Sequence, residues 1–82
     1  MLFEVGDGEL FVTLTRESRR WRLEGEMLAP VREVALLRNG AERQRVDVDD
    51  VGRFSFQDLA GGAWCLAGEA DGTEFVTDSF VL

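Results

Sequence analysis

The sequence contains no histidine, no tyrosine and no lysine, and it contains one cysteine and one proline. Histidine titrates near neutral pH, and lysine and tyrosine are further proton-transfer groups, so most side chains that carry acid–base catalysis are absent. One cysteine excludes an internal disulfide and any zinc site built from several cysteines. The composition therefore predicts a protein that is not an enzyme and that uses no metal or other cofactor.

Membrane and export signals are also absent from the sequence pattern. A membrane-spanning helix needs roughly 18 consecutive apolar residues, and no apolar run approaches that length. The start, Met1 to Val5, has neither the basic segment nor the apolar core of a secretory signal. We therefore expect a cytoplasmic protein that does not associate with membranes.

The charged residues are distributed unevenly along the chain. There are 16 acidic residues and nine arginines, for a formal net charge of -7. Residues 1–46 hold eight of each, so the acidic excess lies in residues 47–82, where Arg53 is the only basic residue. This balance disfavours nucleic acid as a partner, because nucleic acid binding needs a cationic surface that releases counterions. We expect another protein as the partner, with a basic surface as the best match.

Alternation of apolar and polar residues predicts an all-β protein. β-Branched and aromatic side chains recur at every second position, whereas long stretches with helical periodicity are lacking. We expect a single antiparallel two-sheet β-sandwich of about seven short strands, of immunoglobulin-like type, forming one domain over residues 1–82. The predicted extended segments are 2–5, 10–15, 19–27, 31–38, 42–48, 53–57, 63–70 and 74–82, with a turn at Gly6-Asp7-Gly8.

The apolar residues that share a phase along these segments form the predicted core. The face separation is clearest in residues 19–27, where Trp21 and Leu23 alternate with Arg20 and Arg22. The predicted core residues are Leu10, Val12, Leu14, Trp21, Leu23, Val34, Leu36, Phe54, Phe56, Leu59, Trp64 and Leu66.

The dipeptide Asn39-Gly40 predicts a β-hairpin, because both residues tolerate the positive φ angles of a type I′ turn. A strict two-residue loop would place apolar residues of one strand opposite arginines of the other. We therefore expect a longer or bulged loop that pairs Val34 and Leu36 with Val46 and Val48.

The acidic run Asp47, Asp49 and Asp50 has some likeness to a calcium-binding loop. However, Val51 stands where such a loop needs an oxygen ligand, and no glutamate follows at the expected distance. We expect a turn instead, in which an aspartate side chain accepts hydrogen bonds from the backbone before Gly52.

The stretch 34–66, VALLRNGAERQRVDVDDVGRFSFQDLAGGAWCL, resembles the repeated core of transthyretin-like (carboxypeptidase regulatory-like) β-sandwich domains. The resemblance implies a transthyretin-like sandwich that serves as a non-catalytic appendage. Because the pattern consists of core and turn residues, it indicates a fold more than a function. Its positions are filled by Val34, Leu36, Asp49 or Asp50, Gly52, Phe54, Phe56, Leu59, Gly61-Gly62, Trp64 and Leu66.

A second resemblance uses segments from more of the chain. The segment RRWRLEGEM, Pro30, the GRF segment and the closing VTDSFVL together are similar to small C-terminal β domains of actinobacterial proteins. Those proteins accompany alternative sigma factors or their regulatory systems. This resemblance implies a bacterial regulatory setting and brings no catalytic residue.

A cluster of arginines is the candidate partner-binding site. Arg16, Arg19, Arg20 and Arg22 place four guanidinium groups in seven residues, a density suited to carboxylate or phosphate recognition. The alternative is an ordinary solvated face that neighbouring glutamates neutralise. If the cluster binds a partner, Arg20 and Arg22 are the best candidates, because alternation places both opposite the core.

Cys65 and the two tryptophans have structural and functional interpretations. Cys65 lacks an adjacent base or a second thiol, so we expect a structural, partly exposed residue. Trp21 and Trp64 could stack on sugar rings, but both fall in phase with the predicted core.

Several apolar residues fall out of phase with the predicted core, which leaves apolar surface for an interface. The alternatives are strands that bury both faces, or a different register. The closing segment 75–82 is mostly uncharged, so it could pair with a partner strand or a second copy. The out-of-phase residues are Phe11, Ala35, Leu37, Cys65 and Ala67.

These features together favour a non-catalytic protein–protein interaction module in a bacterial regulatory system. Two alternatives remain: an accessory carbohydrate- or ligand-binding sandwich, and a structural or dimerisation domain that pairs through an edge strand.

Overall fold

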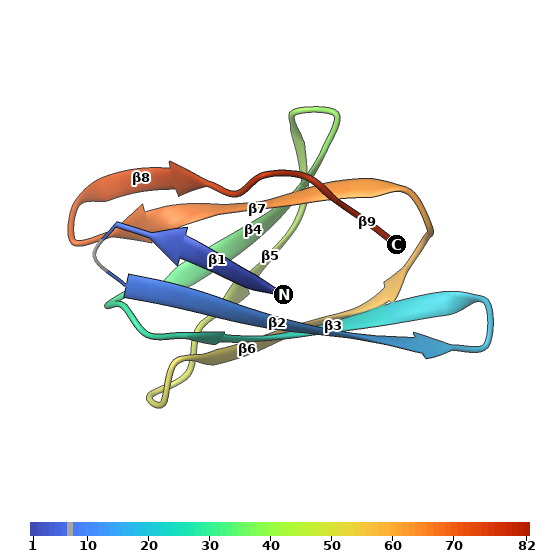
Figure 1. Ribbon diagram of the computed structural model, residues 1–82, viewed down its shortest axis with the longest axis horizontal. Helices are drawn as coiled ribbons and strands as arrows, with labels where there is room; N and C mark the ends of the chain where they lie inside the picture. The colour runs from blue at the N-terminus through green and yellow to red at the C-terminus, as the bar shows by residue number, and fades with distance from the viewer. Residues whose placement is uncertain (7) are drawn as a thin grey trace.

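The computed structural model describes residues 1–6 and 8–82, and these form strands and turns arranged in two layers (Figure 1). The predicted turn at Gly6-Asp7-Gly8 includes Asp7, which lies outside the described residues. The strands are β1 (Leu2–Val5), β2 (Gly8–Glu17), β3 (Arg20–Met27), β4 (Glu33–Arg38), β5 (Ala41–Asp47), β6 (Arg53–Leu59), β7 (Ala63–Ala70), β8 (Thr73–Val76) and β9 (Phe80–Val81).

The two layers are antiparallel sheets that pack face to face. The first sheet has the order β1-β2-β3-β6, and the second has the order β5-β4-β7-β8, with β9 also paired to β7. The predicted antiparallel β-sandwich is confirmed. The described residues form nine strands where about seven were predicted, and the closing segment in particular forms the two separate strands β8 and β9 where one was predicted.

Side-chain alternation places the core between the sheets, as the sequence predicts. Leu10 and Val12 on β2 lie opposite Met27 and Gly25 on β3, and the side chains from both strands point toward the second sheet. Leu14 and Trp21 are half-buried and pack against this core. The other predicted core residues are buried, and the core also contains Val5, Met27, Val31, Ala70 and Phe80.

The β4–β5 hairpin combines a tight turn with a bulge. Asn39 and Gly40 have φ angles of 53° and 77°, and Arg38 pairs with Ala41, so the loop has the predicted two-residue turn chemistry. The register then shifts by one residue, so that Val34 lies opposite Val46. The expected bulge is therefore confirmed, but it lies within β5, and Leu36 faces Gln44 where we expected a valine.

A second bulge extends β6 beyond its predicted end. The predicted strand stops at Gln57, whereas β6 continues to the fully buried Leu59. Asp58 has a φ of 56°, a conformation that aspartate tolerates better than most residues, and the register with β3 shifts at this point. The extra residue keeps both Phe56 and Leu59 on the core side.

Thr77 explains why the closing segment forms two strands. Its backbone N–H donates to the carbonyl of Leu66 at 2.8 Å, and its Oγ1 accepts a hydrogen bond from the Leu66 N–H at 2.9 Å. The hydroxyl thus takes the place of a backbone carbonyl in the ladder beside β7. Because the side chain supplies this acceptor, the chain can bend between β8 and β9.

Replacing Thr77 with the isosteric valine should lower the free energy of unfolding by about 1–3 kcal/mol, because the buried Leu66 N–H would lose its acceptor. Chemical denaturation measures this change. The control Thr77→Ser keeps the hydroxyl and should cost less than Thr77→Val. Equal losses for both variants would contradict the role of the hydroxyl.

Candidate functional site

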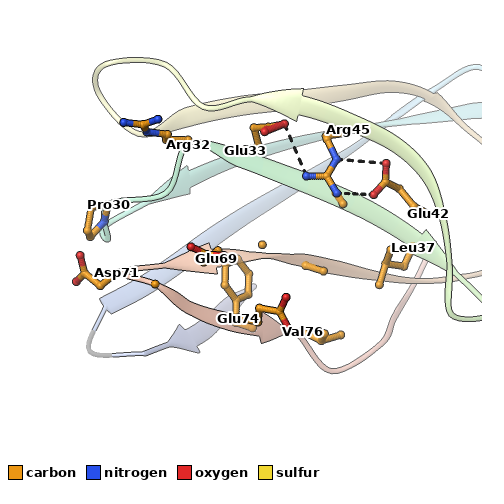
Figure 2. A pocket seen from close by; sticks show the side chains of 15 residues that line it. Pro30, Arg32, Glu33, Leu37, Glu42, Arg45, Glu69, Asp71, Glu74 and Val76 are labelled. Carbon is orange, nitrogen blue, oxygen red and sulfur yellow. Dashed lines mark hydrogen bonds and ion pairs between the residues drawn. The ribbon is translucent and has the colours of Figure 1, made fainter.

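The outer face of the second sheet carries a hollow of about 600 Å³, which we call the outer hollow (Figure 2). It lies on the side of the sheet away from the core, because its residues alternate with the buried Val34, Leu36 and Leu66. It has an apolar floor and a charged rim. The floor includes Ala35, Leu37, Ala67 and Val76, and the rim includes Arg32, Glu33, Glu42, Arg45, Glu69, Asp71 and Glu74.

Strand register brings the floor residues together from three strands. Ala35 on β4 lies opposite Ala67 on β7, and Ala67 in turn lies opposite Val76 on β8. Leu37 and Cys65 form the next cross-strand pair along the same face. The prediction that out-of-phase residues leave apolar surface is met only in part here: Leu37, Cys65 and Ala67 are half-buried, and the strongly exposed residue is Val76, at 65%, which was not among the predicted residues. Ala35 is buried.

Phe11 is the out-of-phase residue that lies elsewhere. It is 43% exposed on the outer face of the first sheet, where it pairs with Leu2. The two outer faces therefore differ: a hollow is found on the second sheet, whereas Phe11 and Leu2 form a small apolar pair on the first.

One side of the rim is held by an ion pair within β5 and a second one between β5 and β4. The guanidinium of Arg45 contacts both carboxylate oxygens of Glu42, at 2.6 and 3.3 Å, and lies 3.7 Å from Glu33 (Figure 2). The hydrogen bond from Arg45 lowers the pKa of the Glu42 carboxyl, and the same contact raises the pKa of Arg45. This side of the rim is thereby largely neutralised.

Replacing Arg45 with alanine should raise the pKa of Glu42 toward the ordinary glutamate value, as measured by a carboxyl ¹³C NMR titration. Because the folded-state pKa is depressed, the stability from this contact is present above the ordinary pKa and is lost as the pH falls through the depressed value. The control is Arg43→Ala at the bulge residue of β5, which should leave the Glu42 pKa unchanged. An unchanged Glu42 pKa in the Arg45 variant would show that the contact is not formed in solution.

The other side of the rim carries carboxylates without counter-charges. Glu69 on β7 and Glu74 on β8 lie directly opposite each other, and Asp71 lies in the turn between these strands. Within residues 1–6 and 8–82, none of the three forms an ion pair. Like charges at directly opposed positions of a sheet are destabilising. This part of the rim is suited to a cationic group.

The arginine cluster predicted as a site does not form a single surface. Arg20 and Arg22 lie on the outer face of the first sheet, as predicted, whereas Arg16 faces Trp21 across the hairpin on the opposite side. Arg19 lies in the turn. Arg22 is already paired, with its Nε 3.2 Å from Glu24 and 3.6 Å from Glu17.

The tryptophans pack in or against the core. Trp64 is buried, and its indole N–H donates to the carbonyl of Ala60 at 3.0 Å. The guanidinium of Arg38 lies 4.8 Å from the ring centroid, a cation–π contact. Core packing is therefore confirmed for Trp64, and its ring is not available to stack on a sugar.

The acidic run forms the predicted turn. Oδ1 of Asp49 accepts hydrogen bonds from the backbone N–H groups of Val51, at 3.0 Å, and Arg53, at 2.8 Å. The Asp49 N–H also donates to the carbonyl of Arg53, which closes the loop. Asp49 thus connects β5 to β6 by an aspartate-capped turn.

The sequence interpretation missed half of the outer hollow. It identified Ala35, Leu37 and Ala67 but did not single out Val76 or the carboxylates of β7 and β8. The available signal was the alternation of Glu74 and Val76 within one extended segment, beside the Asp71-Gly72 turn. Their position beside Ala67 depends on the strand order, which alternation alone does not give.

Comparisons with known proteins do not place the chain in a family: no family model, no curated protein and no solved structure matches it. The transthyretin-like resemblance therefore stays a prediction. In the part of the chain that the structure describes, no helix is long and apolar enough to cross a membrane.

Proposed function

We propose that this domain is a non-catalytic protein-binding module that uses the outer hollow to bind a basic protein surface. The observation that carries the proposal is the combination of a partly exposed apolar floor, in which Val76 is the exposed residue, with the unneutralised carboxylates of Glu69 and Glu74. Protein interfaces commonly combine an apolar centre with a polar rim. The excess of acidic over basic groups on this rim favours a cationic partner.

The two family resemblances extend this proposal without adding site residues. The transthyretin-like assignment depends on the first resemblance, whose residues Phe54, Phe56 and Leu59 are core residues of this β-sandwich. The proposed setting in a bacterial regulatory system depends on the second resemblance alone.

A comparison of domain variants tests the proposed binding surface. The wild-type domain and three double variants are immobilised and exposed to lysate of the source organism, and the retained proteins are identified by mass spectrometry. Glu69→Gln with Glu74→Gln removes two of the three carboxylates of the outer hollow that are unpaired within the described residues. Glu4→Gln with Glu9→Gln is the matched control, because these glutamates also face each other across two strands but lie outside the hollow.

The third variant, Arg20→Ser with Arg22→Ser, examines the arginine cluster. We expect one protein to be retained by the wild type, by the Glu4/Glu9 variant and by the arginine variant, and to be lost from the Glu69/Glu74 variant. Raised salt should weaken its retention, because dissolved ions screen the attraction between the charged groups of the two surfaces. Loss from the arginine variant alone would show that the partner binds the β2–β3 hairpin. Equal retention by all variants would show that neither surface binds the partner.

A further inference from the structure

Strand β8 presents an open edge beside the outer hollow. Within the described residues β8 pairs with β7, and the order of the second sheet ends at β8. The register between the two strands is uninterrupted from Ala67–Val76 to Ala70–Thr73. An unpaired edge of this kind offers backbone N–H and C=O groups to an incoming strand.

The edges formed by β5 and β6 are protected in ways that β8 is not, and the remaining edge, β1, lies outside the outer hollow. Strand β5 contains the Arg43 bulge, and most of its residues are charged or polar. Strand β6 contains the bulge at Asp58. Bulges and charged residues are common devices that prevent edge pairing. Strand β8 has no bulge, and its one charged residue is Glu74.

We propose that the partner supplies an extended basic segment that adds to the edge of β8 as a further strand. This inference rests on the proposed function and specifies how the partner is held. Backbone hydrogen bonds to β8 would provide affinity, and side chains on the outer face of the added strand would lie beside Glu74 and Val76.

Charge selects a basic segment over a second copy of this chain. Symmetric pairing of β8 with β8 would bring Glu74 of one copy close to Glu74 of the other, beside two unneutralised Glu69 carboxylates. Opposed like charges are destabilising, and each copy carries a formal net charge of -7. A cationic strand instead provides the counter-charge that Glu69 and Glu74 lack.

The positions of Glu74 and Val76 also specify the residue pattern of the partner. These residues are two apart on one strand, so they point to the same face. The residues that lie beside them on an added strand are likewise two apart. The segment should therefore carry a basic residue and an apolar residue separated by one position.

Titration of the full ¹⁵N-labelled domain with synthetic peptides tests this mode of binding. The probe is the nonapeptide Thr-Arg-Thr-Val-Thr-Arg-Thr-Val-Thr, which carries arginine and valine on one face. One control peptide replaces arginine by glutamate. The other keeps all side chains and methylates alternate backbone nitrogens on the edge that would face β8, which blocks backbone pairing.

We expect the probe to shift the amide signals of residues 73–76 and to slow their hydrogen exchange. The N-methylated peptide should bind at least about tenfold more weakly, because several backbone hydrogen bonds are lost. The glutamate peptide should not bind. Equal binding of the probe and the N-methylated peptide would overturn strand addition while leaving the proposed acidic binding surface intact.

Two further outcomes would also overturn the inference. One is that the probe shifts β1 or β5 instead of β8. The other is that the domain dimerises in the absence of peptide, as detected by sedimentation, with slowed hydrogen exchange at residues 73–76.

Discussion

Replacing Phe56 with alanine should lower the free energy of unfolding by about 3–5 kcal/mol, the usual range for removal of a buried phenylalanine ring. Phe56 is 1% exposed and lies opposite Leu23 on the neighbouring strand. Its ring also meets that of Phe54 edge to face, with centroids 6.0 Å apart. The variant would lose both the burial and this aromatic contact, and urea denaturation measures the combined effect.

Phe11 provides the matched control for this prediction. It is also a strand phenylalanine, but it is 43% exposed on the outer face of the first sheet. Because much of its surface is already in water, Phe11→Ala should cost clearly less than Phe56→Ala. Equal losses would contradict the placement of the core between the two sheets.

Replacing Gly52 with alanine should destabilise the domain by about 2–5 kcal/mol, from backbone strain together with a steric clash. Gly52 has a φ of 83°, and an added Cβ would overlap the carbonyl oxygen of Met27. The neighbouring backbone cannot easily move away, because the Met27 N–H donates to the carbonyl of Gly52 at 2.6 Å. Thermal and chemical denaturation both measure the loss.

Gly72 separates the two causes. It has a φ of 79°, close to that of Gly52, but an added Cβ would meet no atom within 4 Å. Gly72→Ala should therefore show the cost of backbone strain alone, about 1–2 kcal/mol. If the two variants were equally destabilised, the close contact between Gly52 and Met27 would have no energetic consequence.

The sequence predicts the sheets well because alternation is a local property. Trp21 and Leu23 alternate with Arg20 and Arg22, and this pattern assigns the two faces of β3 without knowledge of its neighbours. The bulges differ in this respect. Nothing local identifies Asp58 as a bulge within a strand, because an aspartate shortly before Ala60 and Gly61-Gly62 is equally typical of a turn.

The bend at Thr77 shows a second limit. Its hydroxyl replaces a backbone acceptor for Leu66, which lies 11 positions earlier in the chain. Such a contact depends on which strand lies beside the closing segment. The sequence therefore predicts one extended segment where the structure has two strands.

The candidate site was predicted in part for the same reason. The outward positions of Leu37 and Ala67 follow from their phase, and the structure confirms them. The pairing of Glu69 with Glu74 requires the register of β7 with β8. Conversely, the density of arginines in residues 16–22 does not reveal that Arg16 lies on the opposite side from Arg20 and Arg22.

The binding surface is best established by an amide chemical-shift footprint of the ¹⁵N-labelled domain with the protein retained in the capture experiment. We expect the largest changes in β7 and β8 around Ala67, Glu74 and Val76, with the signals of Phe11 and Arg20 unchanged. Changes concentrated in residues 16–22, or on the outer face of the first sheet, would show that the outer hollow is not the binding surface.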